Sequence, residues 1–130
     1  MRQASTIYEV TIITHFAAAH NLRNYQGKCE NLHGHNWKVE VTLRGSKLNE
    51  TGMLVDFGDV KRITRELLEE VDHRYLNELP FFQSENPSSE NIARYLFECL
   101  AERLNTEDHW LYKVSAWESP DAYATFIKER

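Results

Sequence analysis

Two segments in the first third of the chain have the composition or the alternation of β-strands. The segment from Thr6 to Thr14 is rich in β-branched residues. The segment from Asn36 to Arg44 alternates apolar and polar residues, with the apolar positions beginning at Trp37. We therefore predict two strands, the second of which has one buried face and one solvent-exposed face.

Two later segments have apolar residues at the spacing of three and four that an amphipathic helix requires. The first helix is predicted from about Asp59 to Val71. The second helix follows Ser88, whose hydroxyl can cap it, and ends near Asn105. Glu90 in its first turn complements the helix dipole. The middle of the chain is thus predicted to be helical.

The last part of the chain predicts two more strands, from Leu111 to Glu118 and from Tyr123 to Lys128, separated by a turn-forming Ser-Pro-Asp cluster. The resulting β-β-α-α-β-β order is typical of an α+β domain. A chain of 130 residues and 15.3 kDa suits one domain, because two separate cores would each be too small to offset the chain entropy easily. We expect residues 1–130 to form a single domain.

Composition narrows the classes of partner. The formal net charge is -5 and the basic residues are scattered, so no basic region is available to neutralise a nucleic-acid backbone. The first residues contain no uninterrupted apolar run such as a signal peptide or a membrane span has. We expect a cytoplasmic protein with no nucleic-acid or membrane partner, in which Cys29 and Cys99 are free thiols.

Three of the six histidines lie close together in the sequence. His33 and His35 are two residues apart, so an extended chain turns both rings to the face that also carries Trp37. His20 adds a third nitrogen if the first strand pairs with the second as a hairpin. Three neutral imidazoles suit Zn²⁺ and leave its fourth tetrahedral position open, which is typical of catalytic sites.

Two other interpretations of these residues remain open at the level of sequence. The His-x-His motif taken alone is about as consistent with a chance or structural pair as with a metal site. Cys29 lies nearby and could be a fourth ligand, which would make a closed structural site. His15 and His109 have no comparable neighbours, and we interpret them as ordinary surface or strand-end residues.

Further candidates for chemistry are a thiol, an Asp-His pair and a late glutamate. Cys29 follows a lysine in a polar loop, where positive charge favours the thiolate and makes it a candidate base. Asp72 precedes His73, and a carboxylate next to an imidazole can fix its tautomer, although adjacent residues need not meet. Glu118 ends an apolar strand and, if turned inward, could accept paired hydrogen bonds from a ring edge.

Several short motifs are spread over nearly the whole chain: F-x-A-A-H, C-x-x-x-H-G-H-N, G-M-L-V-D-F, V-D-H-x-x-L-N, N-P-S-S-E-N and W-E-S. Together they resemble the family of 6-pyruvoyltetrahydropterin synthase and 6-carboxytetrahydropterin synthase. The resemblance implies the tunnelling fold, in which a four-stranded antiparallel sheet carries two helices on one face and subunits join their sheets into a barrel. The predicted β-β-α-α-β-β order agrees with that fold.

The resemblance also implies roles for individual residues. The zinc ligands that it implies are His20, His33 and His35. The proton-transfer residues that it implies are Cys29, Asp72 and His73. The residues that it implies for pterin binding are Glu118, Ser89 and Glu90. Sites in this family lie between subunits, so the resemblance implies a homo-oligomer, and we expect a hexamer.

The implied activity is a zinc-dependent lyase reaction on dihydroneopterin triphosphate. Three residues separate Cys29 from His33, a gap that resembles the carboxytetrahydropterin branch. That branch cleaves the side chain and releases acetaldehyde and triphosphate on the route to queuosine. The pyruvoyl branch, with a longer gap, keeps the carbon chain and leads to tetrahydrobiopterin. The chain departs from the commonest family pattern at Asn21 and Ser119.

Two functions of other classes compete with this one. A zinc ion on three histidines could activate water in a hydrolase, although that mechanism needs no thiol. If Cys29 is instead a ligand, zinc would stabilise a non-catalytic binding module, which metal removal would unfold.

Overall fold

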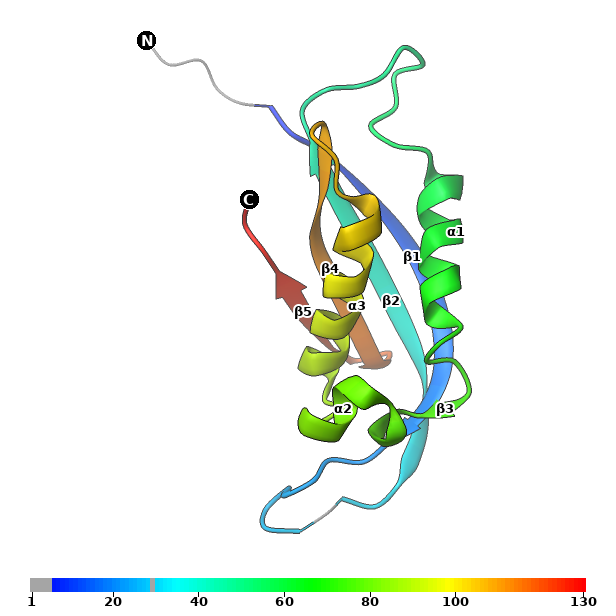
Figure 1. Ribbon diagram of the computed structural model, residues 1–130, viewed down its shortest axis with the longest axis vertical. Coiled ribbons are helices and arrows are strands. Elements are labelled where there is room, and N and C mark those ends of the chain that lie inside the picture. Colours follow the sequence, from blue (N-terminus) through cyan, green and yellow to red (C-terminus); the bar gives the residue numbers. More distant parts are fainter. Residues whose placement is uncertain (1–5, 29) are drawn as a thin grey trace.

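The computed structural model describes residues 6–28 and 30–130, which form one sheet with helices against it (Figure 1). β1 (Tyr8–His20), β2 (His33–Gly45), β4 (His109–Ser119) and β5 (Ala122–Ile127) pair in antiparallel fashion, each with the next. The short strand β3 (Arg74–Tyr75) pairs with β1 in the parallel direction. The sheet is therefore mixed, in the order β3-β1-β2-β4-β5.

The two long helices, α1 (Phe57–Leu68) and α3 (Ser89–Leu104), pack against each other and against one face of the sheet (Figure 1). Between them in sequence, the chain forms a 3₁₀ helix, η1 (Leu76–Glu78), and a short helix, α2 (Pro80–Ser84). Figure 1 shows α2 near the start of α3, at the end of the sheet where β3 lies.

The expected four-stranded antiparallel sheet with two helices is only partly right. The four strands and the two long helices are present, but the described chain also has a fifth, parallel strand and a third α-helix. β3 has 2 residues and α2 has 5, and segments this short contain too few positions for a hydrophobic period to show. Contacts with residues distant in sequence hold β3 and α2 in place, and local sequence does not reveal such contacts.

Side-chain caps fix where the two long helices begin. The carboxylate of Asp56 accepts a hydrogen bond from the N–H of Gly58 at 2.7 Å, at the start of α1. The hydroxyl of Ser88 accepts one from the N–H of Asn91 at 3.1 Å, at the start of α3, as the sequence predicts. α3 therefore begins at a defined residue, Ser89, which faces the candidate site described below.

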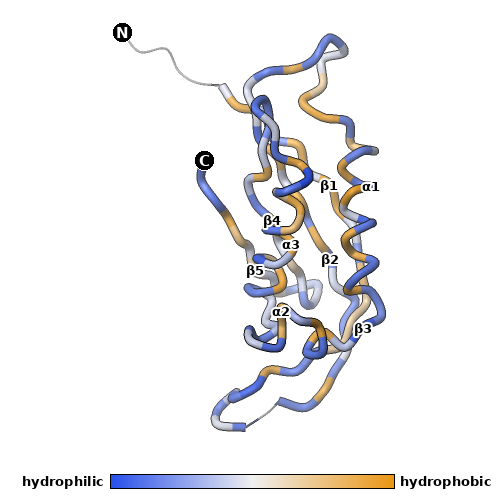
Figure 2. Tube along the Cα trace, viewed as in Figure 1, coloured by the Kyte–Doolittle hydropathy of each residue, from blue (hydrophilic) through white to orange (hydrophobic). Residues whose placement is uncertain are grey.

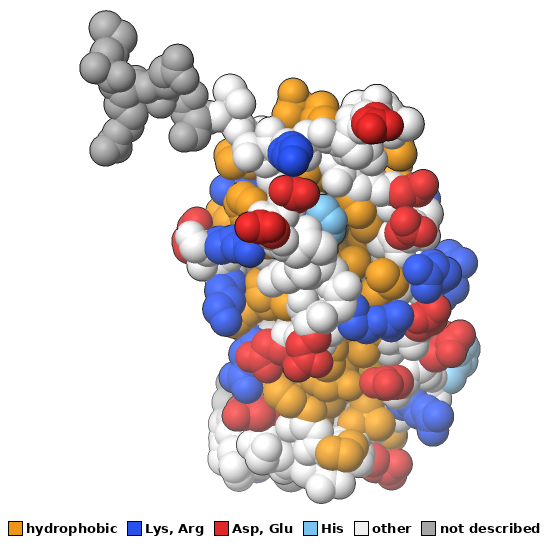
Figure 3. All heavy atoms as spheres, turned by 45° about the horizontal axis from the view of Figure 1, so that its top comes forward, with side chains coloured by type: hydrophobic (Ala, Val, Ile, Leu, Met, Phe, Trp, Pro, Cys, Tyr) orange, Lys and Arg blue, Asp and Glu red, His pale blue; other side chains and the backbone are white. Residues whose placement is uncertain are grey.

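The core lies between the helices and the sheet. The apolar face predicted for β2 is confirmed, since Trp37, Val39, Val41 and Leu43 are all 0% exposed. The trace of α1 alternates between hydrophobic and hydrophilic residues, as expected for a helix with one buried side (Figure 2). On the face shown in Figure 3, acidic and basic side chains are interspersed with hydrophobic ones. No helix in the described part of the chain is long and apolar enough to cross a membrane.

Candidate metal centre and active site

The pairing of β1 with β2 brings the three predicted histidines together. His20 lies directly opposite His33 in the register, and His35 lies opposite Ala18, two positions along the same pair of strands. The ring centroids are 4.6 Å apart for His20 and His33, 5.2 Å for His20 and His35, and 4.7 Å for His33 and His35. The predicted hairpin therefore places all three rings at one end of the sheet.

Backbone carbonyls orient two of these rings. Nδ1 of His20 is 2.7 Å from the carbonyl oxygen of Pro87, and Nδ1 of His33 is 2.8 Å from that of Asn31. A carbonyl only accepts, so each Nδ1 carries a proton, and in the neutral ring Nε2 is then the nitrogen with the lone pair. Nε2 of His20 and Nε2 of His35 are buried without a hydrogen-bond partner among the described residues. A buried polar atom is stabilised by a partner, and a metal ion bound between these two rings would supply one.

Glu118 completes the cluster. Its Oε1 lies 2.9 Å from Nε2 of His35 and 3.7 Å from Nε2 of both His20 and His33. One donor atom from each of these four residues falls within 4.8 Å of the others. Three imidazole nitrogens and one carboxylate oxygen form a donor set that Zn²⁺ accepts in tetrahedral geometry. The residues present thus fit the metal that the sequence predicts.

The electrostatics of the cluster favour neutral imidazole at His35. Burial lowers the pKa of His35 below its ordinary value, and the neighbouring His33 and His20 lower it further, whereas the carboxylate of Glu118 opposes the shift. A neutral ring is the form that binds a metal. The site is therefore suited to metal binding near neutral pH.

The start of α3 contributes a second contact to Glu118. The hydroxyl of Ser89 donates a hydrogen bond to Oε2 of Glu118 at 3.4 Å. Glu90, the next residue, is exposed and is not a member of the four-residue cluster. Of the two α3 residues predicted to bind substrate, the structure brings Ser89 to the cluster and leaves Glu90 at the surface.

Asp72 and His73 meet each other but do not join the cluster. Oδ1 of Asp72 accepts a hydrogen bond from the N–H of Ala17 at 2.9 Å, and Oδ2 lies 3.1 Å from Nδ1 of His73. The Ala17 N–H holds the pKa of Asp72 below its usual value, and His73 adds to this effect. His73 has a left-handed backbone, with φ of 58°, and its side chain is 81% exposed. The pair is thus fixed on β1 and presented to solvent.

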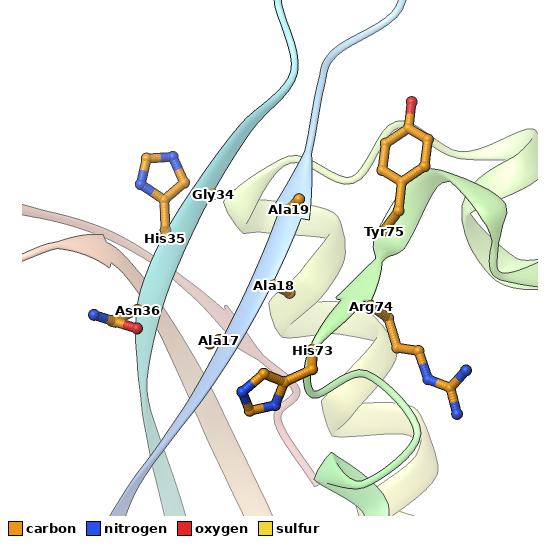
Figure 4. A pocket seen from close by; sticks show the side chains of 9 residues that line it. All are labelled: Ala17, Ala18, Ala19, Gly34, His35, Asn36, His73, Arg74 and Tyr75. Atoms are coloured by element: carbon orange, nitrogen blue, oxygen red, sulfur yellow. The ribbon is translucent and has the colours of Figure 1, made fainter.

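A hollow connects the two groups of residues. Its volume is about 530 Å³, and its lining includes His35 and His73. Figure 4 shows His35 projecting from β2 and His73 lying beside β3, with the small side chains of Ala17, Ala18 and Ala19 on β1 between them. Larger side chains at these alanine positions would fill the hollow.

Cys29 lies outside the described residues, so its predicted role as a base, or as a fourth ligand, stays a prediction. The next residue, Glu30, is anchored by two hydrogen bonds. The N–H of Glu30 donates to the carbonyl of Leu22 at 2.8 Å, and the amide of Asn21 donates to the carbonyl of Glu30 at 3.0 Å. Asn21 also accepts a hydrogen bond from the hydroxyl of Tyr75 at 2.5 Å. Asn21, at which the chain departs from the commonest family pattern, therefore has a structural role.

Sequence reasoning missed the position of Glu118 in the histidine cluster and assigned it to the pterin ring alone. The available signal was parity, because Glu118 shares a strand face with the buried residues Val114 and Ala116. Parity did not indicate which part of β2 it faces. That depends on the register of the β2–β4 pairing, in which Lys38 lies opposite Trp117, and no local pattern reveals the register of strands so far apart in sequence.

Comparisons with known proteins agree with this architecture. The family model described as 6-pyruvoyl tetrahydropterin synthase matches residues 9–129. An Archaeoglobus fulgidus protein with the provisional name 6-carboxy-5,6,7,8-tetrahydropterin synthase is 47% identical over 116 residues, which are 88% of this chain and 91% of that protein. A Caenorhabditis elegans protein with the provisional name 6-pyruvoyl tetrahydrobiopterin synthase is 36% identical over 124 residues, 85% of this chain and 88% of that protein. The solved structure of 6-pyruvoyl tetrahydropterin synthase from C. elegans superposes with a TM-score of 0.83 at 32% identity, covering 98% of this chain and 100% of that one. The chain therefore belongs to the 6-pyruvoyl tetrahydropterin synthase family.

Proposed function

We propose that this protein is a zinc-dependent lyase that converts dihydroneopterin triphosphate to 6-carboxytetrahydropterin, releasing acetaldehyde and triphosphate. The observation that carries the proposal is the convergence of His20, His33 and His35 with a carboxylate, in a chain of the pterin synthase family. When bound there, Zn²⁺ would act as a Lewis acid that lowers the cost of removing protons from the substrate side chain.

The chain's own residues would move those protons. Cys29, as a thiolate, would accept a proton from the substrate, and His73 would accept or donate the next one through Nε2. Asp72 supports this role because its Oδ2 contacts Nδ1 of His73, while its Oδ1 accepts a hydrogen bond from the N–H of Ala17. Nδ1 of His73 thus faces Asp72, while the exposed ring leaves Nε2 to exchange a proton with the substrate.

Substrate recognition would fall to residues around Glu118. Its two carboxylate oxygens could accept the paired N–H donors at the edge of the pterin ring. Ser89 and Glu90 are the first two residues of α3, and Ser89 contacts Glu118. They would provide further polar contacts to the ring.

We propose that the active assembly is a homo-oligomer, most simply a hexamer, with sites between subunits. The side chain of His73 is 81% exposed and is paired with Asp72 outside the metal cluster, so a partner subunit is well placed to complete the site. Among the described residues, β3 pairs with Ala18 and Ala19 of β1 alone, and β5 is the last strand at the opposite edge. Both edges could therefore pair with neighbouring sheets.

The branch assignment rests on two observations. Three residues separate Cys29 from His33, and identity is 47% to the relative named for the carboxy product against 36% to the one named for the pyruvoyl product. The carboxy product would place the reaction on the route to queuosine, and we propose that it takes place in the cytoplasm. The pyruvoyl reaction is the second candidate, because proteins named for it are also relatives over most of the chain.

Product analysis tests the proposal. The zinc-loaded protein is incubated with dihydroneopterin triphosphate without any reductase, and the pterin and aldehyde products are separated by chromatography. We expect carboxytetrahydropterin together with acetaldehyde. Pyruvoyltetrahydropterin without aldehyde would show the second candidate to be right, and no consumption of substrate would reject both.

A further inference from the structure

Glu118 occupies the position that three histidines leave open. Its Oε1 is within 3.7 Å of all three Nε2 atoms and only 2.9 Å from that of His35. Oε1 of Glu118 lies this close to Nε2 of His35, although that buried nitrogen has no hydrogen-bond partner of good geometry among the described residues. An ion shared by all four donor atoms explains this arrangement, since each nitrogen could then direct its lone pair to the same point.

The carboxylate is held there from a separate element. Ser89, the first residue of α3, donates to Oε2 and leaves Oε1 for the cluster. The N-terminus of α3 adds a favourable field for negative charge. The histidines belong to the β1–β2 hairpin, whereas Glu118 belongs to β4, so the fourth donor can move without disturbing the other three.

We propose that Glu118 is a displaceable fourth metal ligand, bound to the metal through Oε1 while the site is empty of substrate and released when the pterin enters. This deepens the proposed function and rests on it only for the identity of the displacing molecule. The paired ring N–H donors need both carboxylate oxygens, so the ring competes with the metal for Oε1. Binding of the ring would therefore free the fourth position at the moment when the substrate side chain reaches it.

Metal affinity in the absence of any pterin tests the ligand role. Zn²⁺ affinity is measured by chelator competition for the native protein, for Glu118→Gln and for Glu30→Gln. Glu30 is a matched control, because its Oε1 lies 3.8 Å from Nε2 of His33 but it is not one of the four converging residues. We expect Glu118→Gln to weaken zinc binding by at least the roughly 10–100-fold that loss of an outer-shell partner causes, and Glu30→Gln to leave it within twofold.

Co²⁺ in place of Zn²⁺ reports the coordination directly through its visible absorption. Glu118→Gln should change the spectrum of the pterin-free protein, and Glu30→Gln should not. Unchanged affinity and spectrum in Glu118→Gln, or equal losses in both variants, would overturn the proposal. Should Glu118→Gln not fold, as judged by circular dichroism, Ser89→Ala takes its place and should weaken metal binding by a smaller factor.

Displacement is tested with 7,8-dihydroneopterin, which lacks the triphosphate. Titrating it into the Co²⁺-loaded native protein should change the visible spectrum as the carboxylate leaves. A saturated complex with an unchanged spectrum would show that Glu118 stays on the metal, and the displacement would be wrong. Loss of metal affinity in Glu118→Gln, together with no turnover of dihydroneopterin triphosphate by the native protein, would keep the ligand role and reject the proposed function. Normal turnover by the native protein, with unaltered metal affinity in Glu118→Gln, would do the reverse.

Discussion

The environment of His20 shows how a single residue can be prepared for metal binding by the backbone around it. The residue is 2% exposed, and its Nδ1 is already bonded to the carbonyl of Pro87. Its Nε2 has no hydrogen-bond partner among the described residues, and leaving a buried polar atom unpaired costs about 1–3 kcal/mol. Metal binding would offset that cost, so the ion should stabilise the fold as well as the site.

Removing either of the other two histidines should release the metal. His33→Ala or His35→Ala deletes one of the converging nitrogens, and zinc measured by elemental analysis should fall well below one atom per subunit. His15→Ala is the matched control, because His15 lies on β1 but is exposed and outside the cluster. Full zinc retention in both cluster variants would reject the site.

Cys29→Ala tests whether Cys29 transfers protons or binds the metal. If the thiol only transfers protons, the variant keeps its zinc and its circular dichroism spectrum while turnover falls by about 10²-fold or more. The measurements are elemental analysis and steady-state kinetics on the same preparation. Zinc that leaves with the thiol would instead identify Cys29 as a ligand and favour the structural interpretation of the site.

At the scale of elements, the site depends on segments that tie the sheet to the helices. Asp72 follows the end of α1 and accepts the N–H of Ala17, which attaches the turn after α1 to the outer edge of β1. The left-handed backbone of His73 costs of order 1 kcal/mol for a residue with a Cβ atom, so the surrounding contacts must hold it. The contact between the turn after α1 and β1 thus positions the Asp72–His73 pair.

The Asp72 contact makes a contribution to stability that depends on pH. The folded state lowers the pKa of Asp72, so its contribution is present above the ordinary pKa and is lost as pH falls through the lowered folded value. Asp72→Asn should therefore reduce the free energy of unfolding near pH 7 by well under about 1 kcal/mol, because the carboxylate is partly exposed. Urea unfolding should show this difference shrinking below about pH 4. A difference that grew on acidification would contradict the assigned cause.

The cap of α3 affects both stability and the site. Ser88→Ala removes the hydroxyl that accepts the N–H of Asn91 and should lower the free energy of unfolding by about 1 kcal/mol. Because the next residue, Ser89, contacts Glu118, zinc affinity should fall slightly as well. Ser46→Ala, at an exposed position just after β2, serves as the control and should change neither quantity in chelator competition or urea unfolding.

Sequence patterns predicted those features of the fold that follow from nearest neighbours along the chain. Strand alternation placed His33 and His35 on one face, and a cap residue located the start of α3. The position of Glu118 depends on how β4 pairs with β2, and the contact of Asp72 with Ala17 joins residues 55 positions apart. Such features arise from tertiary packing, so they could not be predicted from local sequence.

At the scale of the whole molecule, the separation of the Asp-His pair from the metal cluster has a consequence for assembly. Light scattering should give a mass that is a multiple of the 15.3 kDa chain, and six times that mass for a hexamer. A monomer at working concentration would contradict the proposal that sites lie between subunits.

Mixing inactive variants tests the shared site more sharply. His73→Ala and Cys29→Ala should each be inactive alone, but hybrid oligomers formed from equal amounts of both would contain about a quarter of sites with neither change, if the two residues come from different subunits. Activity should return toward that fraction after the mixture is dissociated and reassembled. No recovery in hybrids verified by mass would show that both residues act within one chain.

The register of the β1–β2 hairpin would give a bound metal a part in folding. His20 faces His33, and His35 lies two positions along on the same side. A slip of one residue between the strands would turn the two β2 histidines away from His20, and no such hairpin could hold the ion. Metal binding would therefore favour the native alignment of β1 with β2 over a slipped one. Chains refolded from urea with Zn²⁺ present should recover native structure in higher yield than chains refolded with a chelator.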